Sequence, residues 1–270
     1  MQVVMFSFLT NSFASAFQYR EILLRTTLAE LRQKYAGSML GLLWLFLSPL
    51  FLLAIYSLVY LAIFRIQPAS LSRFEYVLYI LSGLVPCLAF CEALAAGSAS
   101  LTLNRAILLN TVYPSELVPL RSVLATQVST VVGLALVVVF SVTLGKLTWT
   151  AFFVPLVWAF QLMFVMGLVW VLSVASLVVR DIQHVLAFVC MLLLIVSPIA
   201  YTNEMVPAAI SMLVFMNPLS YFVIGFHDVI VFGRLPSATI LICIIGLGLV
   251  SCSTGFWVFQ RAKKAMFDYA

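Results

Sequence analysis

The sequence predicts an all-α polytopic membrane protein with six transmembrane helices, and three observations lead to this fold class. Of the 270 residues, 64% are hydrophobic and only 9% are charged, and the mean hydropathy is +1.18. The charges fall between charge-free stretches such as 39–64, 122–145 and 147–179, and a helix needs about 20 apolar residues to cross a bilayer. These stretches are continuously apolar, whereas barrel strands alternate, so helices satisfy the backbone in lipid.

The apolar stretches set the order of the expected spans. We place six spans at about 39–64, 76–101, 120–144, 151–178, 184–202 and 237–259. Together they form a single membrane domain over 39–270, with no room for a soluble catalytic domain. In the second span, Gly83 and Pro86 should bend the helix, and Glu92 interrupts its apolar surface. Membrane helices tolerate such breaks where neighbouring helices cover the freed backbone groups.

The region before the first span, residues 1–38, should contain an amphipathic helix. Its apolar residues recur at helical spacing: Phe13, Phe17, Leu24, Leu28, Leu31 and Tyr35. Two acid–base pairs, Glu21–Arg25 and Glu30–Lys34, are spaced i,i+4 in the favoured order. We expect this helix to lie along the cytoplasmic face of the membrane. A helix that is merely solvated is the alternative.

The positions of lysine and arginine favour six spans over seven. With both termini in the cytoplasm, the cytoplasmic side carries Arg20, Arg25, Arg32, Lys34, Arg105, Arg121, Arg180, Arg261, Lys263 and Lys264. The outer side carries only Arg65, Arg73, Lys146 and Arg234. This is the positive-inside bias of membrane proteins. The remaining apolar run contains Pro207 and Asn217–Pro218, which would break a straight span, so residues 203–234 should form short re-entrant or interfacial helices.

Few residues are suited to catalysis or metal binding. His184 and His227 lack a second ligand at metal spacing, and there is no Gly-rich nucleotide loop. We therefore expect a transport subunit rather than an enzyme, with no cofactor bound by this chain. Glu92, the acid deep in an apolar segment, either lines a pathway or makes a local structural hydrogen bond. Gly37 and Gly41 form a GxxxG pattern that permits close helix packing.

Several stretches follow one another in an order that is typical of a known family. The first is LRQKYAGSMLGLLWLFLSPL at Leu31–Leu50, where a basic residue, Tyr, Gly–Ser and Leu–Gly–x–x–Trp lead into a helix with a proline. The others are Ser82–Gly83–Leu84 with Phe90, Asn104–Arg105 with Tyr113–Pro114–Ser115–Glu116 and Pro119, Arg180–Asp181–Ile182, Ser197–Pro198–Ile199 with Tyr201, and Asn217–Pro218–Leu219. Together they resemble the permeases of ABC-2 type polysaccharide exporters, which carry O-antigen, teichoic acid or capsule precursors.

The resemblance implies a permease of the bacterial inner membrane that works as two copies with two copies of a separate ATPase. The ATPase would use ATP and Mg, and the substrate would be a glycan linked to polyprenyl pyrophosphate. A coupling helix over about 104–112 would contact the ATPase in the first cytoplasmic loop. The residues implied in this contact are Asn104, Arg105, Tyr113, Pro114 and Glu116.

Two further sets of residues follow from the resemblance. The pyrophosphate could be attracted by the basic residues of the inner interface, Arg20, Arg25, Arg32 and Lys34. The same residues could equally serve only to set the topology. The outer gate would contain Pro198, Tyr201, Asn217, Pro218 and His227. Family members often carry arginine at the position of His227, which puts a cationic role there in doubt.

Two other interpretations stay open. An ABC-2 permease that exports a drug or a lipid is the first, although such permeases usually lack the GSxLGxxW start of the first span. A membrane enzyme or an ATP-independent carrier is the second. The lack of charge pairs within the apolar segments disfavours it, because proton-coupled carriers usually contain several ionisable groups at membrane depth.

Overall fold

The computed structural model describes residues 18–59, 71–105, 114–179, 181–201 and 208–269, and within these ranges it contains helices and turns but no strand. Five helices there are long and apolar enough to cross a membrane. They are α3 (Trp44–Leu58, preceded by η1, Gly41–Leu43), α4 (Arg73–Leu103), α6 (Leu117–Thr143), α7 (Val154–Val178, preceded by η3, Trp149–Phe153) and α11 (Ala238–Tyr269). The predicted multi-pass, all-helical membrane class is therefore confirmed.

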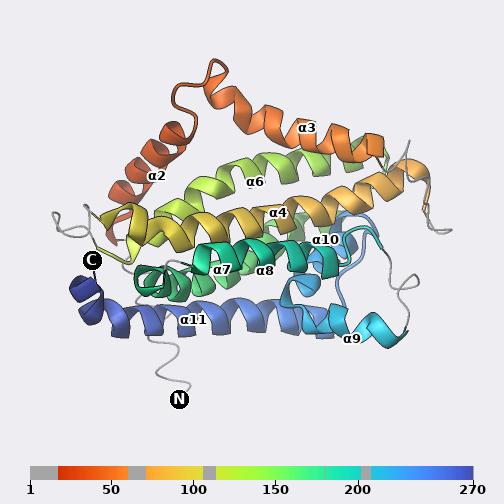
Figure 1. The fold of residues 1–270 in the computed structure, drawn as a ribbon. Coiled ribbons are helices and arrows are strands. Elements are labelled where there is room, and N and C mark those ends of the chain that lie inside the picture. Colours follow the sequence, from red (N-terminus) through yellow and green to blue (C-terminus); the bar gives the residue numbers. More distant parts are fainter. Residues whose placement is uncertain (1–17, 60–70, 106–113, 180, 202–207, 270) are drawn as a thin grey trace.

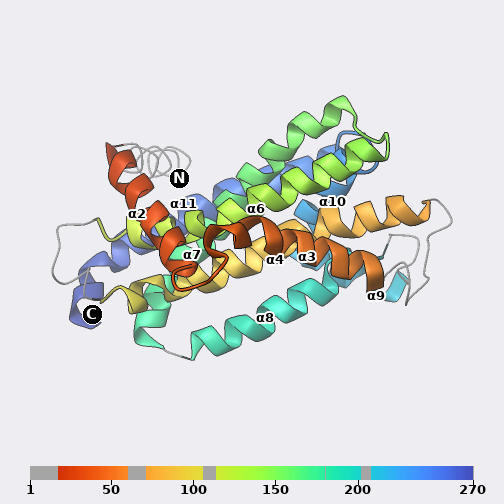
Figure 2. The same cartoon turned by 90° about the horizontal axis from the view of Figure 1, so that it is seen from above.

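Shorter helices complete the bundle: α2 (Arg20–Lys34), α8 (Ile182–Val196), α9 (Ala208–Met216) and α10 (Pro218–Ile230). Helices α3, α4, α6, α7, α8 and α11 run side by side and alternate in direction along the chain (Figure 1). Figure 2 shows α8 on one flank of this bundle. Helix α2 and the last turns of α11 lie at one end, which we call the α2 end, and α9 and α10 lie at the other, the α10 end.

Helix α4 forms the centre of the bundle and is the most buried of the long helices. A capping box begins it, because Ser72 N donates to the Glu75 carboxylate at 2.8 Å while the Ser72 hydroxyl accepts from Glu75 N. The helix then continues for 31 residues through Pro86 and Glu92. At the proline, Gln161 Nε2 of α7 donates to Pro86 O at 2.7 Å. A neighbouring helix thus binds the backbone at the proline itself, whereas the carbonyl that loses its helical donor is that of Ser82, four residues earlier.

The two short helices expected before the last long helix are present, and α10 lies inside the protein. The chain breaks at Asn217, whose Oδ1 accepts a hydrogen bond from Leu219 N at 2.9 Å and caps α10. Phe222 and Phe226 are completely buried, and α10 packs against α4, α7 and α11. Its 13 residues rise only about 20 Å at 1.5 Å each, so α10 is too short to cross a bilayer.

Helices α7 and α11 approach each other at two glycines. A Cβ atom placed on Gly167 would lie 2.1 Å from Ser251 O, and one placed on Gly255 would lie 2.1 Å from Gly167 O. Across the same contact, Ser251 Oγ donates to Phe164 O at 2.9 Å. Small residues allow membrane helices to pack closely and to hydrogen-bond to each other. Glycine is therefore required at both positions.

The prediction that Gly37 and Gly41 mediate close helix packing is wrong for this chain. Both lie in the turn between α2 and α3, with φ angles of +80° and +51°. These left-handed values favour glycine because it lacks a Cβ atom. A Cβ atom on either residue would meet nothing within 4 Å. The two glycines therefore allow the chain to turn, and close helix packing occurs elsewhere.

Candidate functional site

Helix α2 contacts the bundle through a narrow face. Leu23, Thr27 and Leu31 are buried, and the helix packs against α6. The apolar face expected from the spacing is a different one, because Leu24 and Leu28 are 61% and 51% exposed. Only Leu31 belongs to both faces. The side of α2 that meets the bundle is therefore not the apolar face that the sequence predicts to lie along the membrane.

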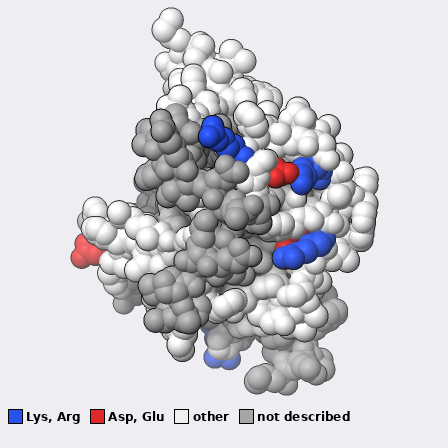
Figure 3. Space-filling model, turned by 90° about the vertical axis from the view of Figure 1, so that its right-hand side faces the viewer, with Lys and Arg blue, Asp and Glu red and all other residues white. Residues whose placement is uncertain are grey.

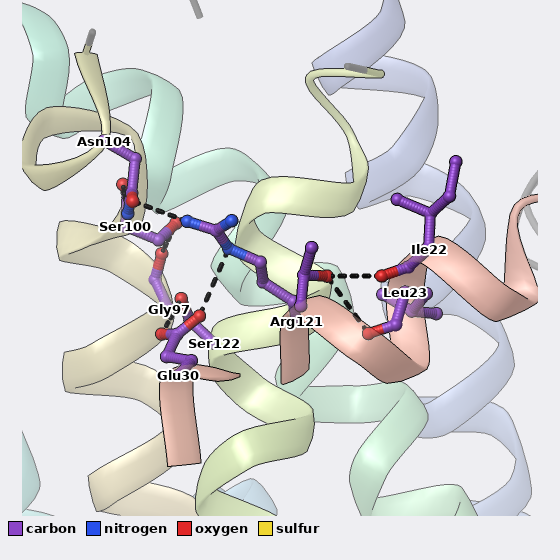
Figure 4. A network of polar contacts seen from close by, with 9 residues as sticks. Ile22, Leu23, Glu30, Gly97, Ser100, Asn104, Arg121 and Ser122 are labelled. Carbon is purple, nitrogen blue, oxygen red and sulfur yellow. Dashed lines mark hydrogen bonds and ion pairs between the residues drawn. The ribbon is translucent and has the colours of Figure 1, made fainter. Parts of the chain in front are cut away.

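Three helices meet at Arg121, near the start of α6 (Figure 4). Its Nε lies 3.2 Å from the Glu30 carboxylate of α2, and its Nη2 donates to Asn104 Oδ1 at the end of α4. Ser122 Oγ donates to the other oxygen of Glu30. Arg121 is only 8% exposed, and a charge at such a site is costly without its partners. We call Glu30, Asn104, Arg121 and Ser122 the α2 junction.

A second ion pair and a cavity lie beside the α2 junction. Lys34 of α2 pairs with Glu92 of α4. Both residues, together with Glu30 and Arg121, line a cavity of about 650 Å³. Small side chains form part of its wall: Ala29, Ala96 and Ala125. Glu30 and Lys34 thus pair with other helices rather than with each other, and Glu92 has a local partner while it also borders the cavity.

The residues expected to contact an ATPase fall on both sides of a gap in the described chain. Asn104 ends α4 within the α2 junction, and Arg105 follows it on the surface. Residues 106–113, which include Tyr113 and most of the predicted coupling helix, lie outside the described residues. The chain resumes at Pro114, which is half-buried. The structure thus places the two ends of the predicted loop at the α2 end of the bundle.

The far side of this loop is anchored by Glu116, just before α6. Its carboxylate lies 2.9 Å from Lys263 Nζ of α11, and its carbonyl oxygen accepts a hydrogen bond from Trp170 Nε1 of α7 at 3.3 Å. Arg261, two residues before Lys263 on α11, lies over the Trp257 ring, 4.3 Å from its centroid. The start of α6 is therefore fixed to α7 and α11 by polar contacts.

At the α10 end, tyrosines of α4 hold the bend that follows α8. Tyr79 OH lies 3.0 Å from Tyr201 O and 3.4 Å from Pro198 O, and it can donate to one of them at a time. Tyr76 OH donates to Ala200 O at 2.6 Å. The bend that ends α8 is therefore tied to the centre of the bundle.

The ring of Tyr79 also stacks on His227 of α10, with centroids 3.7 Å apart. His227 is 1% exposed, and neither of its ring nitrogens has a hydrogen-bond partner among the described residues. Gly83 leaves room for it, since a Cβ atom there would lie 2.7 Å from His227 Nε2. Nearby, Asn217 Nδ2 donates to Ser197 Oγ at 2.9 Å. We call Tyr79 together with the predicted gate residues the α10 junction: Tyr79, Pro198, Tyr201, Asn217, Pro218 and His227.

Two ion pairs lie near the α10 junction, and Asp228 in one of them is buried. Lys146 pairs with Glu75 at 2.7 Å, and Arg234 pairs with Asp228 at 2.7 Å. Figure 3 views this end and shows blue and red side chains next to one another among largely white side chains of the described residues. Each of these acids thus has a basic neighbour, so the pairs add little net charge to this end.

The remaining predicted residues are exposed on α2. Arg20, Arg25 and Arg32 lie on its surface, whereas Lys34 borders the cavity. Sequence reasoning missed the central role of Arg121 in the α2 junction, because a basic residue at a helix end predicts topology and not partners. Within the described residues, no group of His, Cys, Asp and Glu side chains could hold a metal ion.

Tyr79 is the other residue that sequence reasoning missed. The sequence predicts an interfacial aromatic there, because tyrosines are common at membrane surfaces. Its spacing of three residues from Tyr76 is the available signal, since it places two hydroxyls on one face of a helix. The carbonyl groups that they bind belong to a segment more than 100 residues away, at Pro198, Ala200 and Tyr201.

Comparison with known proteins identifies the family. The profile of the ABC-2 type transporter family matches residues 18–231. The O-antigen export system permease protein RfbA of Myxococcus xanthus is 25% identical over 251 residues, which are 92% of this chain and 95% of the relative. Two RfbA proteins of Klebsiella pneumoniae are 26% and 25% identical over 246 residues, which are 90% of this chain and 92% of theirs. The family match covers most of the chain and both junctions, and this protein therefore belongs to the ABC-2 type transporter family.

Proposed function

We propose that this chain is the permease subunit of an ATP-driven exporter that moves a lipid-linked, O-antigen-like polysaccharide across the bacterial inner membrane. The observation that carries the proposal is the alignment of three permeases named for O-antigen export with at least 90% of the chain. The glycan would be attached to polyprenyl pyrophosphate. Export of a drug or another lipid by the same family is the second candidate, because the family match does not select the substrate.

The topology that we propose has six passes and both termini in the cytoplasm. Helix α8 would supply the sixth pass, because its 15 residues rise about 22 Å and the following bend extends the chain towards the α10 end. Basic side chains support the α2 end as the cytoplasmic one. Its described lysines and arginines are Arg20, Arg25, Arg32, Lys34, Arg105, Arg121, Arg261 and Lys263, against Arg73, Lys146 and Arg234 at the α10 end.

A separate ABC ATPase would power transport, in an assembly of two permeases and two ATPases. ABC-2 permeases generally work with such a partner, and ATP and Mg would be bound there and not by this chain. The segment from Asn104 to Glu116 is the cytoplasmic surface that we expect the ATPase to contact. Large apolar side chains on α3 and α8 are exposed, among them Phe51 and Phe188, and these faces would contact lipid and the second permease.

The cavity and the α10 junction would lie at the two ends of the transport path. The pyrophosphate of the carrier would approach the basic surface of α2, from which Lys34 extends into the cavity wall. At the outer side, α9 and α10 would form the gate. The contacts of Tyr79 with the bend after α8 would keep this gate closed in the conformation described here.

Deletion of the gene tests the proposed function. Lipid-linked glycan should accumulate on the cytoplasmic side of the inner membrane, and a plasmid copy should restore its export. In proteoliposomes, the permease with its ATPase should move the glycan only when ATP can be hydrolysed. Normal glycan export in the deletion strain would refute the proposal. If the purified complex moved a drug or a simple lipid but no glycan, the second candidate would be correct.

A further inference from the structure

The α2 junction joins α2 to the segment that is proposed to meet the ATPase. Asn104 is the first residue of that segment, and it accepts a hydrogen bond from Arg121. The same guanidinium contacts the Glu30 carboxylate on α2. One side chain therefore bridges the start of the cytoplasmic loop and the helix that borders the cavity. Figure 4 shows Arg121 extended between these two partners.

Among the described residues, the main packing contact of α2 is with one helix, α6. The buried side chains of α2 are Leu23, Thr27 and Leu31. Towards α4, the cavity of about 650 Å³ separates the helices, and the pair Lys34–Glu92 spans the gap. The close packing of protein interiors resists any movement that unpacks an apolar core. A helix held by polar contacts across a cavity can shift without such unpacking.

Arginine is suited to the position that Arg121 occupies. Its planar guanidinium donates in several fixed directions, whereas the lysine ammonium is a single point charge on a flexible stem. Nη2 donates a hydrogen bond to Asn104, while Nε lies at ion-pair distance from the Glu30 carboxylate, 3.2 Å away, without hydrogen-bond geometry. Glu30 is held further by Ser122, the residue next to Arg121 on α6. A displacement of Asn104 therefore changes the geometry at Glu30 through one rigid group.

We propose that Arg121 is a positioning residue that transmits displacement of the cytoplasmic loop to α2. This inference rests on the proposed function, in which the loop contacts an ATPase. When the ATPase moves the loop, Asn104 moves with it, the guanidinium follows, and Glu30 carries α2 relative to α4. The cavity between α2 and α4 changes its opening as a result. Small helix shifts of this kind are a common way to transmit conformational change.

The test compares ATP hydrolysis and transport in proteoliposomes that contain the complete permease–ATPase complex. In Arg121→Lys and Glu30→Gln, ATP hydrolysis should stay within about twofold of the wild type. Glycan transported per ATP hydrolysed should fall about tenfold or more, because the loop no longer moves α2. The matched control is Glu75→Gln, which removes the acid of the Lys146–Glu75 pair at the opposite end and should leave the ratio unchanged.

A second measurement follows the cavity directly. In Ala125→Cys, the new thiol lines the cavity, and its reaction with a membrane-impermeant maleimide reports the opening. The protein without this substitution corrects for native cysteines. Trapping the ATPase with ADP and vanadate should change the labelling rate by about threefold or more when Arg121 is present. With Arg121→Lys in the same protein, the rate should no longer respond to the trapped nucleotide.

The outcomes separate this inference from the proposed function. If both single variants keep the transport per ATP of the wild type, or if labelling still responds to nucleotide in Arg121→Lys, Arg121 does not transmit the movement. If Arg121→Lys fails to co-purify with the ATPase, the transport per ATP of Glu30→Gln decides whether the junction transmits the movement. The exchange of Glu30→Arg with Arg121→Glu should recover part of the coupling, since the pair is restored in reverse. A wild-type complex that hydrolyses ATP but moves no glycan would instead refute the proposed function.

Discussion

Replacing Gly167 by alanine should loosen the contact between α7 and α11. The added Cβ atom would lie 2.1 Å from the backbone oxygen of Ser251, whereas close carbon–oxygen contacts lie at about 3.3–3.6 Å. The helices would have to separate by about 1 Å to restore that distance. A backbone oxygen cannot rotate away as a side chain can. The hydrogen bond from Ser251 to Phe164 O lies in the same contact and would be lengthened.

The size of the effect follows from two opposing contributions. Overpacking typically costs about 1–3 kcal/mol, and the upper value applies because the obstacle is backbone. Alanine in place of a helical glycine returns about 1 kcal/mol through its better helix propensity. The net loss should be about 2 kcal/mol, which corresponds to about 4–8 °C in melting temperature for a chain of roughly this size.

Gly246, on α11, provides the matched control. A Cβ atom there would meet nothing within 4 Å, so Gly246→Ala should leave stability unchanged or raise it by up to about 1 kcal/mol. Both variants and the wild type would be melted in the same detergent, with their oligomeric state checked by size exclusion. Equal melting temperatures for Gly167→Ala and Gly246→Ala would refute the inference that α7 and α11 require glycine at their contact.

Three further predictions concern the centre of the bundle and the α10 end. Asn217→Ala removes the cap of α10 and should lower stability by about 1–2 kcal/mol. Asn217→Asp should lower stability by less, and equal losses of stability in the two variants would contradict a capping role. Gln161→Leu removes the hydrogen bond to Pro86 O and should lower stability by about 1 kcal/mol. An unchanged melting temperature would show that this hydrogen bond does not stabilise the bundle. Tyr79→Phe keeps the stacking on His227 but removes one of the two tyrosine hydroxyls that hold the bend after α8, so proteolysis at the bend should accelerate. Unchanged cleavage would show that the Tyr79 hydroxyl does not hold the bend.

Much of the fold follows from the sequence because lipid imposes simple requirements. The apolar runs around α4, α6 and α7 predict their helices to within a few residues, since each must satisfy its backbone within the bilayer. The break at Asn217–Pro218 is likewise visible, because proline ends one helix and can begin another. Less visible is the burial of α10, whose apolar composition suits a membrane surface as well as a protein interior.

The sites were only partly predictable. The residues Pro198, Tyr201, Asn217 and His227 were identified by resemblance. The fold places Pro198, Tyr201 and His227 against Tyr79, whereas Asn217 binds Ser197. At the α2 end, the spacing of Glu30 and Lys34 predicts a pair within one helix. Each instead binds a different helix, because partners on α4 and α6 lie nearby and the preferences within a single helix amount to only about 0.5 kcal/mol.

By itself, the sequence determined that this protein is an all-helical membrane protein, about where α4, α6 and α7 begin and end, and which family its motifs resemble. These properties depend on composition and on the order of residues along short segments, because a long apolar segment in a bilayer must form a helix. Only the tertiary structure decided that Arg121 joins α2 to α4, that Gly167 and not Gly37 provides the close helix contact, and that Glu92 borders a cavity. Contacts between residues distant in sequence depend on how each helix is rotated about its axis and docked on its neighbours. The pattern of apolar residues does not predict this rotation, because lipid and the protein interior are equally apolar surroundings.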